Sequence, residues 1–151
     1  MVGSSSSGEQ TAPNGVGIDR EEQFHVSEVS RSYWRVTFDN GPVNLLDPDT
    51  VAQLGALIGR IENDPDLTVI VFRSDKPGYF MAHWDFRADN ARMAGMRPGP
   101  TGLHPYLDNF VRLSRLPVAT ISEIRGRTRG AVNIQVVHGS WWLRGGVGSG
   151  L

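Results

Sequence analysis

The spacing of apolar and polar residues predicts alternating strands and helices. Residues 33–39 predict a strand, which ends at the turn signal Asn40-Gly41-Pro42. Residues 67–72 form a continuous apolar run rich in β-branched side chains, the pattern of a strand that is covered on both faces. Residues 118–124 predict the next buried strand, directly after Pro117.

A helix is predicted between the first two of these strands. Asp47 is a good N-cap and Pro48 suits the first helical position. Apolar residues then recur at helical spacing until Pro65, at Val51, Leu54, Leu57, Ile58 and Ile61. These signals predict a helix that begins at Pro48 and is stopped by Pro65.

A second helix is predicted to begin after Thr101 as its cap and to end before Pro117. Its apolar face would use Leu103, Leu107, Phe110, Val111 and Ser114. Strand, helix, strand, helix, strand with right-handed crossovers is an α/β unit. We therefore expect residues 67–72 and 118–124 to lie in one sheet.

Composition divides the chain of 151 residues into three parts. Residues 1–23, rich in Ser, Gly and Pro, predict a disordered leader, and residues 24–131 predict a single core. Residues 132–151 form an atypical tail rich in Gly and Trp, without a period of 2 or 3.6 after Val137. We interpret this tail as the product of a reading-frame shift near Ala131. Residues 86–100 predict a mobile loop.

Charge and composition exclude several functions. A net charge of −1 gives no electrostatic case for nucleic acid or an anionic membrane. No apolar stretch approaches the ~20 residues that span a bilayer, and the start of the chain lacks the features of a secretory signal. There is no cysteine, and the four histidines have no ligand-like spacing, so we expect no metal site and a cytoplasmic protein.

The candidate chemistry lies where two predicted strands end in small residues. Ala82 and Ala131 could each present a backbone N–H to one point, and two such donors can hold a developing negative charge. The alternative is that small residues fill tight strand ends.

Three segments around these residues resemble the crotonase family of enoyl-CoA hydratases and isomerases, over residues 33–131. Asn40-Gly41-Pro42-Val43-Asn44-Leu45-Leu46 resembles its N-x-L turn, and Phe80-Met81-Ala82-His83-Trp84-Asp85 its F-x-A-G-x-D segment. Leu116-Pro117-Val118-Ala119-Thr120-Ile121 followed by Gly126 resembles its P-x-I-A-x-x-x-G strand. His83 stands where glycine is commonest.

The resemblance implies an incomplete α/β fold of the ClpP/crotonase type, built from ββα repeats. It implies a lyase or isomerase of fatty acid metabolism that binds an acyl-CoA thioester and needs no cofactor besides the coenzyme A of its substrate. Ala82 and Ala131 would form the oxyanion hole, and His83, Trp84, Asp85 and Phe86 would join them in binding substrate. The family habit implies a homotrimer, or association with a full-length relative.

The chain departs from the family at its end. Val132 replaces an expected glycine, and Ile134 occupies the position where many hydratases carry their first glutamate. The second glutamate belongs to a part of the fold that this sequence does not contain. We therefore expect catalysis to be impaired by truncation. The alternatives are a non-catalytic binding or subunit-interacting remnant, and a fragment that aggregates.

For several other residues near the predicted site, the sequence leaves two possible roles open. His83 could act as an acid or base, or simply fill the glycine position. Asp85 could orient the loop, but a capping role is the stronger expectation. Six arginines could bind the phosphates of coenzyme A or form a solvated face: Arg87, Arg92, Arg97, Arg125, Arg127 and Arg129.

Overall fold

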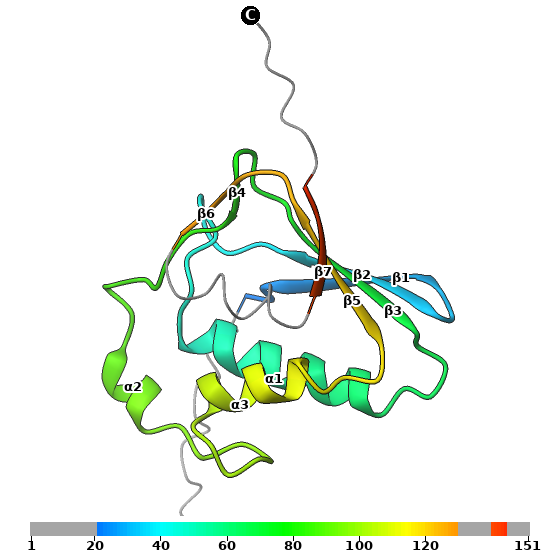
Figure 1. Ribbon diagram of the computed structural model, residues 1–151. Coiled ribbons are helices and arrows are strands. Elements are labelled where there is room, and N and C mark those ends of the chain that lie inside the picture. The colour runs from blue at the N-terminus through cyan, green and yellow to red at the C-terminus, as the bar shows by residue number, and fades with distance from the viewer. Residues whose placement is uncertain (1–20, 130–139, 145–151) are drawn as a thin grey trace, which may run out of the picture.

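The computed structural model describes residues 21–129 and 140–144, and these form two sheets and three helices (Figure 1). The larger sheet has five strands in the order β1-β2-β3-β5-β7, and the smaller one pairs β4 with β6. The strands are β1 (Phe24–Ser30), β2 (Tyr33–Phe38), β3 (Val69–Ser74), β4 (Tyr79–Met81), β5 (Ala119–Ile124), β6 (Arg127–Thr128) and β7 (Ser140–Arg144). The helices are α1 (Pro48–Glu62), α2 (Asn90–Ala94) and α3 (Pro105–Leu113).

The predicted α/β unit is confirmed. Strand β3 pairs in parallel with both β2 and β5, in a register that runs from Val69 opposite Ala119 to Arg73 opposite Glu123. Only β1 runs antiparallel to its neighbour β2. The two strands predicted from β-branched runs therefore lie side by side in one sheet.

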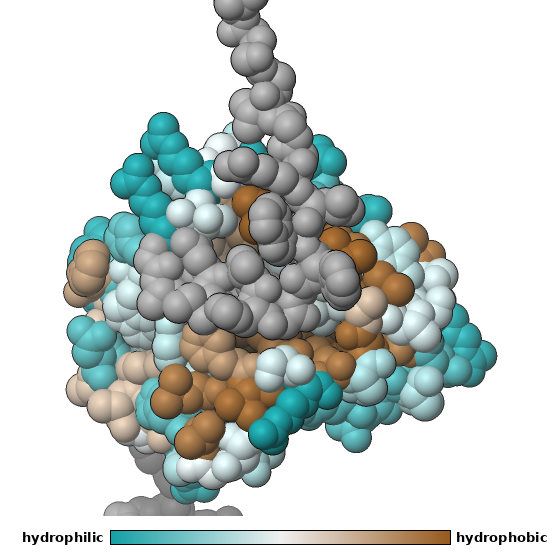
Figure 2. Space-filling view, viewed as in Figure 1, coloured by the Kyte–Doolittle hydropathy of each residue, from teal (hydrophilic) through white to brown (hydrophobic). Residues whose placement is uncertain are grey.

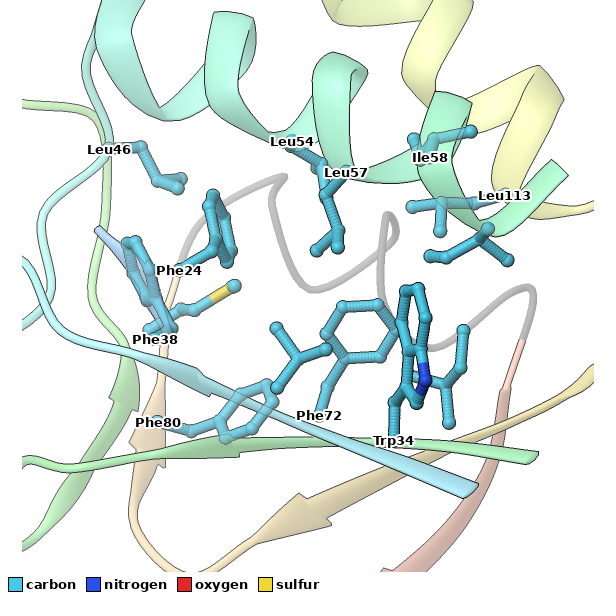
Figure 3. Close-up of a cluster of buried hydrophobic side chains, with 14 of the residues drawn as sticks. Phe24, Trp34, Phe38, Leu46, Leu54, Leu57, Ile58, Phe72, Phe80 and Leu113 are labelled. Atoms are coloured by element: carbon cyan, nitrogen blue, oxygen red, sulfur yellow. The ribbon is translucent and has the colours of Figure 1, made fainter. Parts of the chain in front are cut away.

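The core lies on one face of this sheet. Alternate residues of β2 and β3, including Trp34, Val36 and Phe72, are buried and face α1. Figure 3 shows the side chains of Trp34 and Phe72 directed toward that helix, which carries Leu54 and Leu57. The expectation that residues 67–72 would be covered on both faces is wrong in this part of the chain, because both α1 and α3 lie on the same side of the sheet (Figure 1).

Helix α1 begins as the sequence predicts. Asp47 caps it, accepting a hydrogen bond from the Thr50 N–H at 2.7 Å, while the Thr50 hydroxyl accepts one from the Asp47 N–H at 3.1 Å. The helix ends at Glu62 with Asn63 as C-cap, slightly before the predicted end. Pro65 follows two residues after this cap, where proline is common because it cannot continue a helix.

The prediction for α3 is wrong in two respects. His104 caps this helix, whereas the N–H and hydroxyl of Thr101 donate to the carboxylate of Asp108. The buried residues are Asp108, Asn109 and Leu113, while Leu103 and Leu107 of the predicted apolar face are 41% and 50% exposed. The polar side faces inward because Asp108 and Asn109 find hydrogen-bond partners on neighbouring segments.

Both ends of the predicted core extend further than composition indicates. Gln23, assigned to the leader, is 6% exposed, and its side-chain amide donates to the Asp47 carboxylate. In the tail, β7 pairs in parallel with β5, so the absence of a period did not exclude a strand. The remaining residues of the predicted leader (1–20) and tail (132–139 and 145–151) lie outside the described residues.

Candidate active site

The segment that follows β4 is held by the loop that precedes α1. The Ala82 N–H donates to the Asn44 carbonyl at 3.0 Å, and the Leu46 N–H donates to the His83 carbonyl at 3.0 Å. The Asp85 N–H donates in turn to the Leu46 carbonyl at 2.7 Å. The two segments that the sequence singled out for their motifs are thus paired with each other.

Asn44 organises this pairing. It is fully buried, with a left-handed backbone (φ 55°) that asparagine tolerates better than most residues. Its side-chain amide nitrogen donates to the Phe38 carbonyl (3.1 Å), the Ser74 hydroxyl (2.8 Å) and the Phe80 carbonyl (3.0 Å). Its side-chain oxygen accepts from the Asn40 N–H at 2.8 Å. The sequence indicated a turn here but gave no signal for this network.

Ala82 does not offer a free N–H, and this prediction is wrong. Its N–H is bonded to Asn44. The Trp84 N–H, by contrast, points away from Leu46. It shares a trans peptide group with the His83 carbonyl, which accepts from Leu46, and the N–H and C=O of such a group point in opposite directions. The Trp84 carbonyl also points away from Leu46, because it shares a peptide group with the Asp85 N–H, which donates to Leu46.

The backbone N–H and C=O of Trp84 point toward the side of the segment on which β6 lies. The Met81 carbonyl, which points away from Asn44 by the same peptide geometry, accepts from the Arg129 N–H at 3.2 Å. The close approach of this strand depends on Gly126, where an added Cβ would lie 2.3 Å from the Gly78 carbonyl carbon. Ala131, Val132 and Ile134 lie outside the described residues.

The His83 side chain folds back over the edge of the segment 82–85 that faces β6. Its Nδ1 lies 2.7 Å from the Trp84 carbonyl oxygen, and its ring lies against that of Phe86, with the centroids 5.2 Å apart. Phe86 itself is 81% exposed. An imidazole and an exposed aromatic ring therefore flank the peptide whose N–H is turned toward β6.

Asp85 and Trp84 fix the turn that follows. The Asp85 carboxylate accepts from the Arg87 N–H at 2.9 Å and so orients the turn, whereas Asp89 is the N-cap of α2. The Trp84 indole N–H donates to the Asn90 side-chain oxygen at 3.1 Å and so ties the segment to α2. Within residues 21–129 and 140–144, no hydrogen bond engages the Trp84 backbone N–H.

The segment 86–100 was expected to be a mobile loop, but it contains α2, which is bonded to neighbouring segments. Arg92 makes two hydrogen bonds to the Asp49 carboxylate, at 2.8 and 2.5 Å, and these raise the pKa of Arg92 above its ordinary value. His104 Nε2 donates to the Met93 carbonyl at 2.8 Å. Three more of the six arginines have protein contacts: Arg87 with Asp85, Arg125 with Glu123, and Arg127 over the Tyr79 ring.

Two hollows lie elsewhere on the described surface. A pocket of about 440 Å³ lies between β1 and α1, and a pocket of about 250 Å³ lies beside the loop that joins β3 to β4. Residues 82–86 line neither of them, so a cavity shared by Ala82 and Ala131 stays a prediction. Among residues 21–129 and 140–144 there is no group of three potential metal ligands, and no described helix is long and apolar enough to cross a membrane.

Residues 28–134 match the family model described as enoyl-CoA hydratase/isomerase. The chain belongs to this family. The match covers β2 to β6 and both paired segments of the candidate site, which is the region of the sequence resemblance.

Solved structures show the same fold. A putative enoyl-CoA hydratase from Streptomyces avermitilis is 23% identical, with a TM-score of 0.72 over 82% of this chain and 46% of that one. Human mitochondrial delta3-delta2-enoyl-CoA isomerase is 21% identical, with a TM-score of 0.60 over 80% of this chain and 46% of that one. The described fold is therefore crotonase-like, and the chain spans less than half the length of these relatives.

Proposed function

We propose that this chain binds an acyl-CoA thioester and stabilises its enolate with backbone N–H groups at the edge beside β6. The observation that carries the proposal is the orientation of the Trp84 N–H, which points away from Leu46 toward the side of β6. Membership of the enoyl-CoA hydratase/isomerase family supports the choice of substrate class. The second donor would be Ala131, which follows two residues after Arg129 in the sequence.

Backbone donors suit this task because their positions are fixed before the ligand arrives. Asn44 and Leu46 hold the segment 82–85 through three backbone hydrogen bonds, so the Trp84 N–H needs no rearrangement to meet an oxyanion. The exposed ring of Phe86 and the imidazole of His83 would contact the acyl group, while Asp85 maintains the turn.

Hydration of the double bond is expected to be weak. The described residues near this edge offer the carboxylate of Asp85, which the Arg87 N–H already engages. Glu123 lies on β5 and is paired with Arg125. A hydratase needs groups that activate water and move protons, and each such group typically contributes about 10²–10⁴-fold in rate.

A second candidate function is that of a non-catalytic partner of a full-length relative. It is favoured by the outer side of α3, where Leu103 and Leu107 are exposed. Figure 2 shows hydrophobic side chains gathered on this side of the molecule. Burial of such a patch against another protein would be favourable.

Acetoacetyl-CoA provides the test, because its enolate absorbs ultraviolet light and reports stabilisation of the oxyanion directly. We expect the chain to raise the enolate fraction of this ligand. The variant Trp84→Pro removes the N–H, whereas the control Trp84→Ala keeps it and loses the same indole. Loss of one donor should cost about 2.7–4 kcal/mol of enolate stabilisation.

The pairing with Leu46 should survive in both variants, since it uses the His83 carbonyl and the Asp85 N–H. The proposal fails if acetoacetyl-CoA does not bind, or if Trp84→Pro and Trp84→Ala stabilise the enolate equally. Binding without any enolate signal in the unmodified chain would favour the non-catalytic partner.

A further inference from the structure

We propose that His83 is the proton-transfer group for a thioester held at the Trp84 N–H, so that the chain forms enolates with a single imidazole base. This inference rests on the proposed function and adds a residue that can move the proton. It concerns thioesters with an acidic C–H next to the carbonyl, and it predicts proton exchange or a double-bond shift as the chemistry.

The hydrogen bond to Trp84 fixes the tautomer of His83. A carbonyl oxygen only accepts hydrogen bonds, so the Nδ1 that lies 2.7 Å from it must carry the proton. In the neutral imidazole, Nε2 then keeps its lone pair and is the basic atom. None of the hydrogen bonds within the described part of the chain uses Nε2 of His83.

The same bond places the ring beside the proposed oxyanion donor. The N–H and C=O of Trp84 both point away from Leu46, because the two flanking peptide groups are bonded to that residue. The imidazole bonded to the Trp84 oxygen is therefore on the side to which the Trp84 N–H is directed. The Phe86 ring lies against it at an interplanar angle of 31°.

The proton transfer can be written with a thioester and this one base. Nε2 takes a proton from the carbon next to the thioester carbonyl, and the C–H electron pair forms a carbon–carbon double bond. The π pair of the carbonyl moves to oxygen, where the Trp84 N–H stabilises it. The imidazolium then returns the proton to the same carbon, or to the far carbon of a conjugated enolate.

One base suffices for that sequence, since the same Nε2 that removes a proton also gives one back. When the Nε2 proton exchanges with solvent before the return, the carbon takes up a solvent proton. Hydration differs, because it adds a hydroxyl to one carbon and a proton to the next. The geometry of His83 thus points to exchange or isomerisation and not to hydration.

The test is the exchange of the C2 protons of butanoyl-CoA in D₂O, followed by mass spectrometry. His83→Asn keeps an amide N–H near the position of Nδ1, and so retains a donor for the Trp84 carbonyl, but it lacks the base. We expect exchange to fall about 10²–10⁴-fold, a far larger effect than any loss of butanoyl-CoA affinity in calorimetry. The control His25→Asn changes an exposed histidine of β1 and should exchange normally.

A second variant separates chemistry from structure. His83→Gly should lose exchange and regain part of it when free imidazole is added. Loss that imidazole does not restore, or normal exchange by a folded His83→Asn, would overturn the inference. An unmodified chain that binds no thioester would instead overturn the proposed function, so the two failures are distinguishable.

Discussion

At the scale of single residues, Asn44 has the most structural consequences. Its backbone carbonyl holds Ala82, and its side chain bonds to residues on β2, β3 and β4. Its φ of 55° lies in a region that is costly for alanine and free for glycine. One residue therefore links the sheet to the segment that carries Trp84.

Replacement of Asn44 should destabilise the fold severely. In Asn44→Ala, the Phe80 carbonyl and the Asn40 N–H lose the bonds to Asn44, whereas the Phe38 carbonyl keeps the bond from the Asp75 N–H. Each buried group left without a partner costs about 1–3 kcal/mol. We expect the free energy of unfolding in urea to drop by at least ~3 kcal/mol. Asn44→Gly should be about 1 kcal/mol better than Asn44→Ala, because the backbone penalty disappears. Equal stability of the two variants would show that the left-handed backbone does not matter here.

At the scale of elements, α1 and α3 are joined by polar contacts. Asn109 donates to the Val51 carbonyl at 2.8 Å, and Arg112 reaches the Glu62 carboxylate at 2.6 and 2.9 Å. Asp108, which is 2% exposed, accepts from the N–H and hydroxyl of Thr101 and from Arg112. The orientation of α3 follows from these specific bonds.

The pKa of Asp108 gives this contact a pH dependence. Burial by itself would raise that pKa, but the bonds from Thr101 and Arg112 outweigh burial and hold it below its usual range. A depressed folded pKa contributes stability that is present above the unfolded value of about 3.9 and is lost as pH falls through the folded value.

Asp108→Asn should therefore lower the free energy of unfolding by about 1.5–3 kcal/mol at neutral pH. The difference from the unmodified chain should shrink as the pH falls below about 4. Urea unfolding across this pH range checks the sign of the pH dependence. The control is Asp75→Asn, which changes an exposed carboxyl in the loop between β3 and β4. A difference that stays constant with pH would show that the charge of Asp108 is not involved.

At the scale of the whole molecule, stability depends on one core between the large sheet and α1. Phe72 of β3 is 6% exposed and lies within this core (Figure 3). Phe86, beside the candidate site, is 81% exposed. The same side chain thus occurs in two opposite environments.

Phe72→Ala should cost about 3–5 kcal/mol in the free energy of unfolding, because it removes a buried ring and leaves a cavity. Phe86→Ala should change it by no more than about 0.5 kcal/mol. Thermal or urea unfolding of both variants checks this contrast. Comparable losses would mean that Phe86 is buried against parts of the molecule outside residues 21–129 and 140–144.

The sequence by itself determined the family, the sheet of parallel strands and α1. These follow from local signals: β-branched runs for β3 and β5, and the Asp47 cap with helical spacing for α1. Local patterns suffice there because each residue's preference depends mainly on its neighbours along the chain.

Only the tertiary structure decided which N–H of the motif faces the site and which side of α3 is buried. Ala82 is the small residue that the motif emphasises, but its N–H is bonded to Asn44, so Trp84 is left to present its own. The polar Asp108 is buried because Thr101 and Arg112 are placed to bond with it. A sequence pattern shows that a residue is polar or small, whereas its hydrogen-bond partner is fixed by segments that meet only in the folded chain.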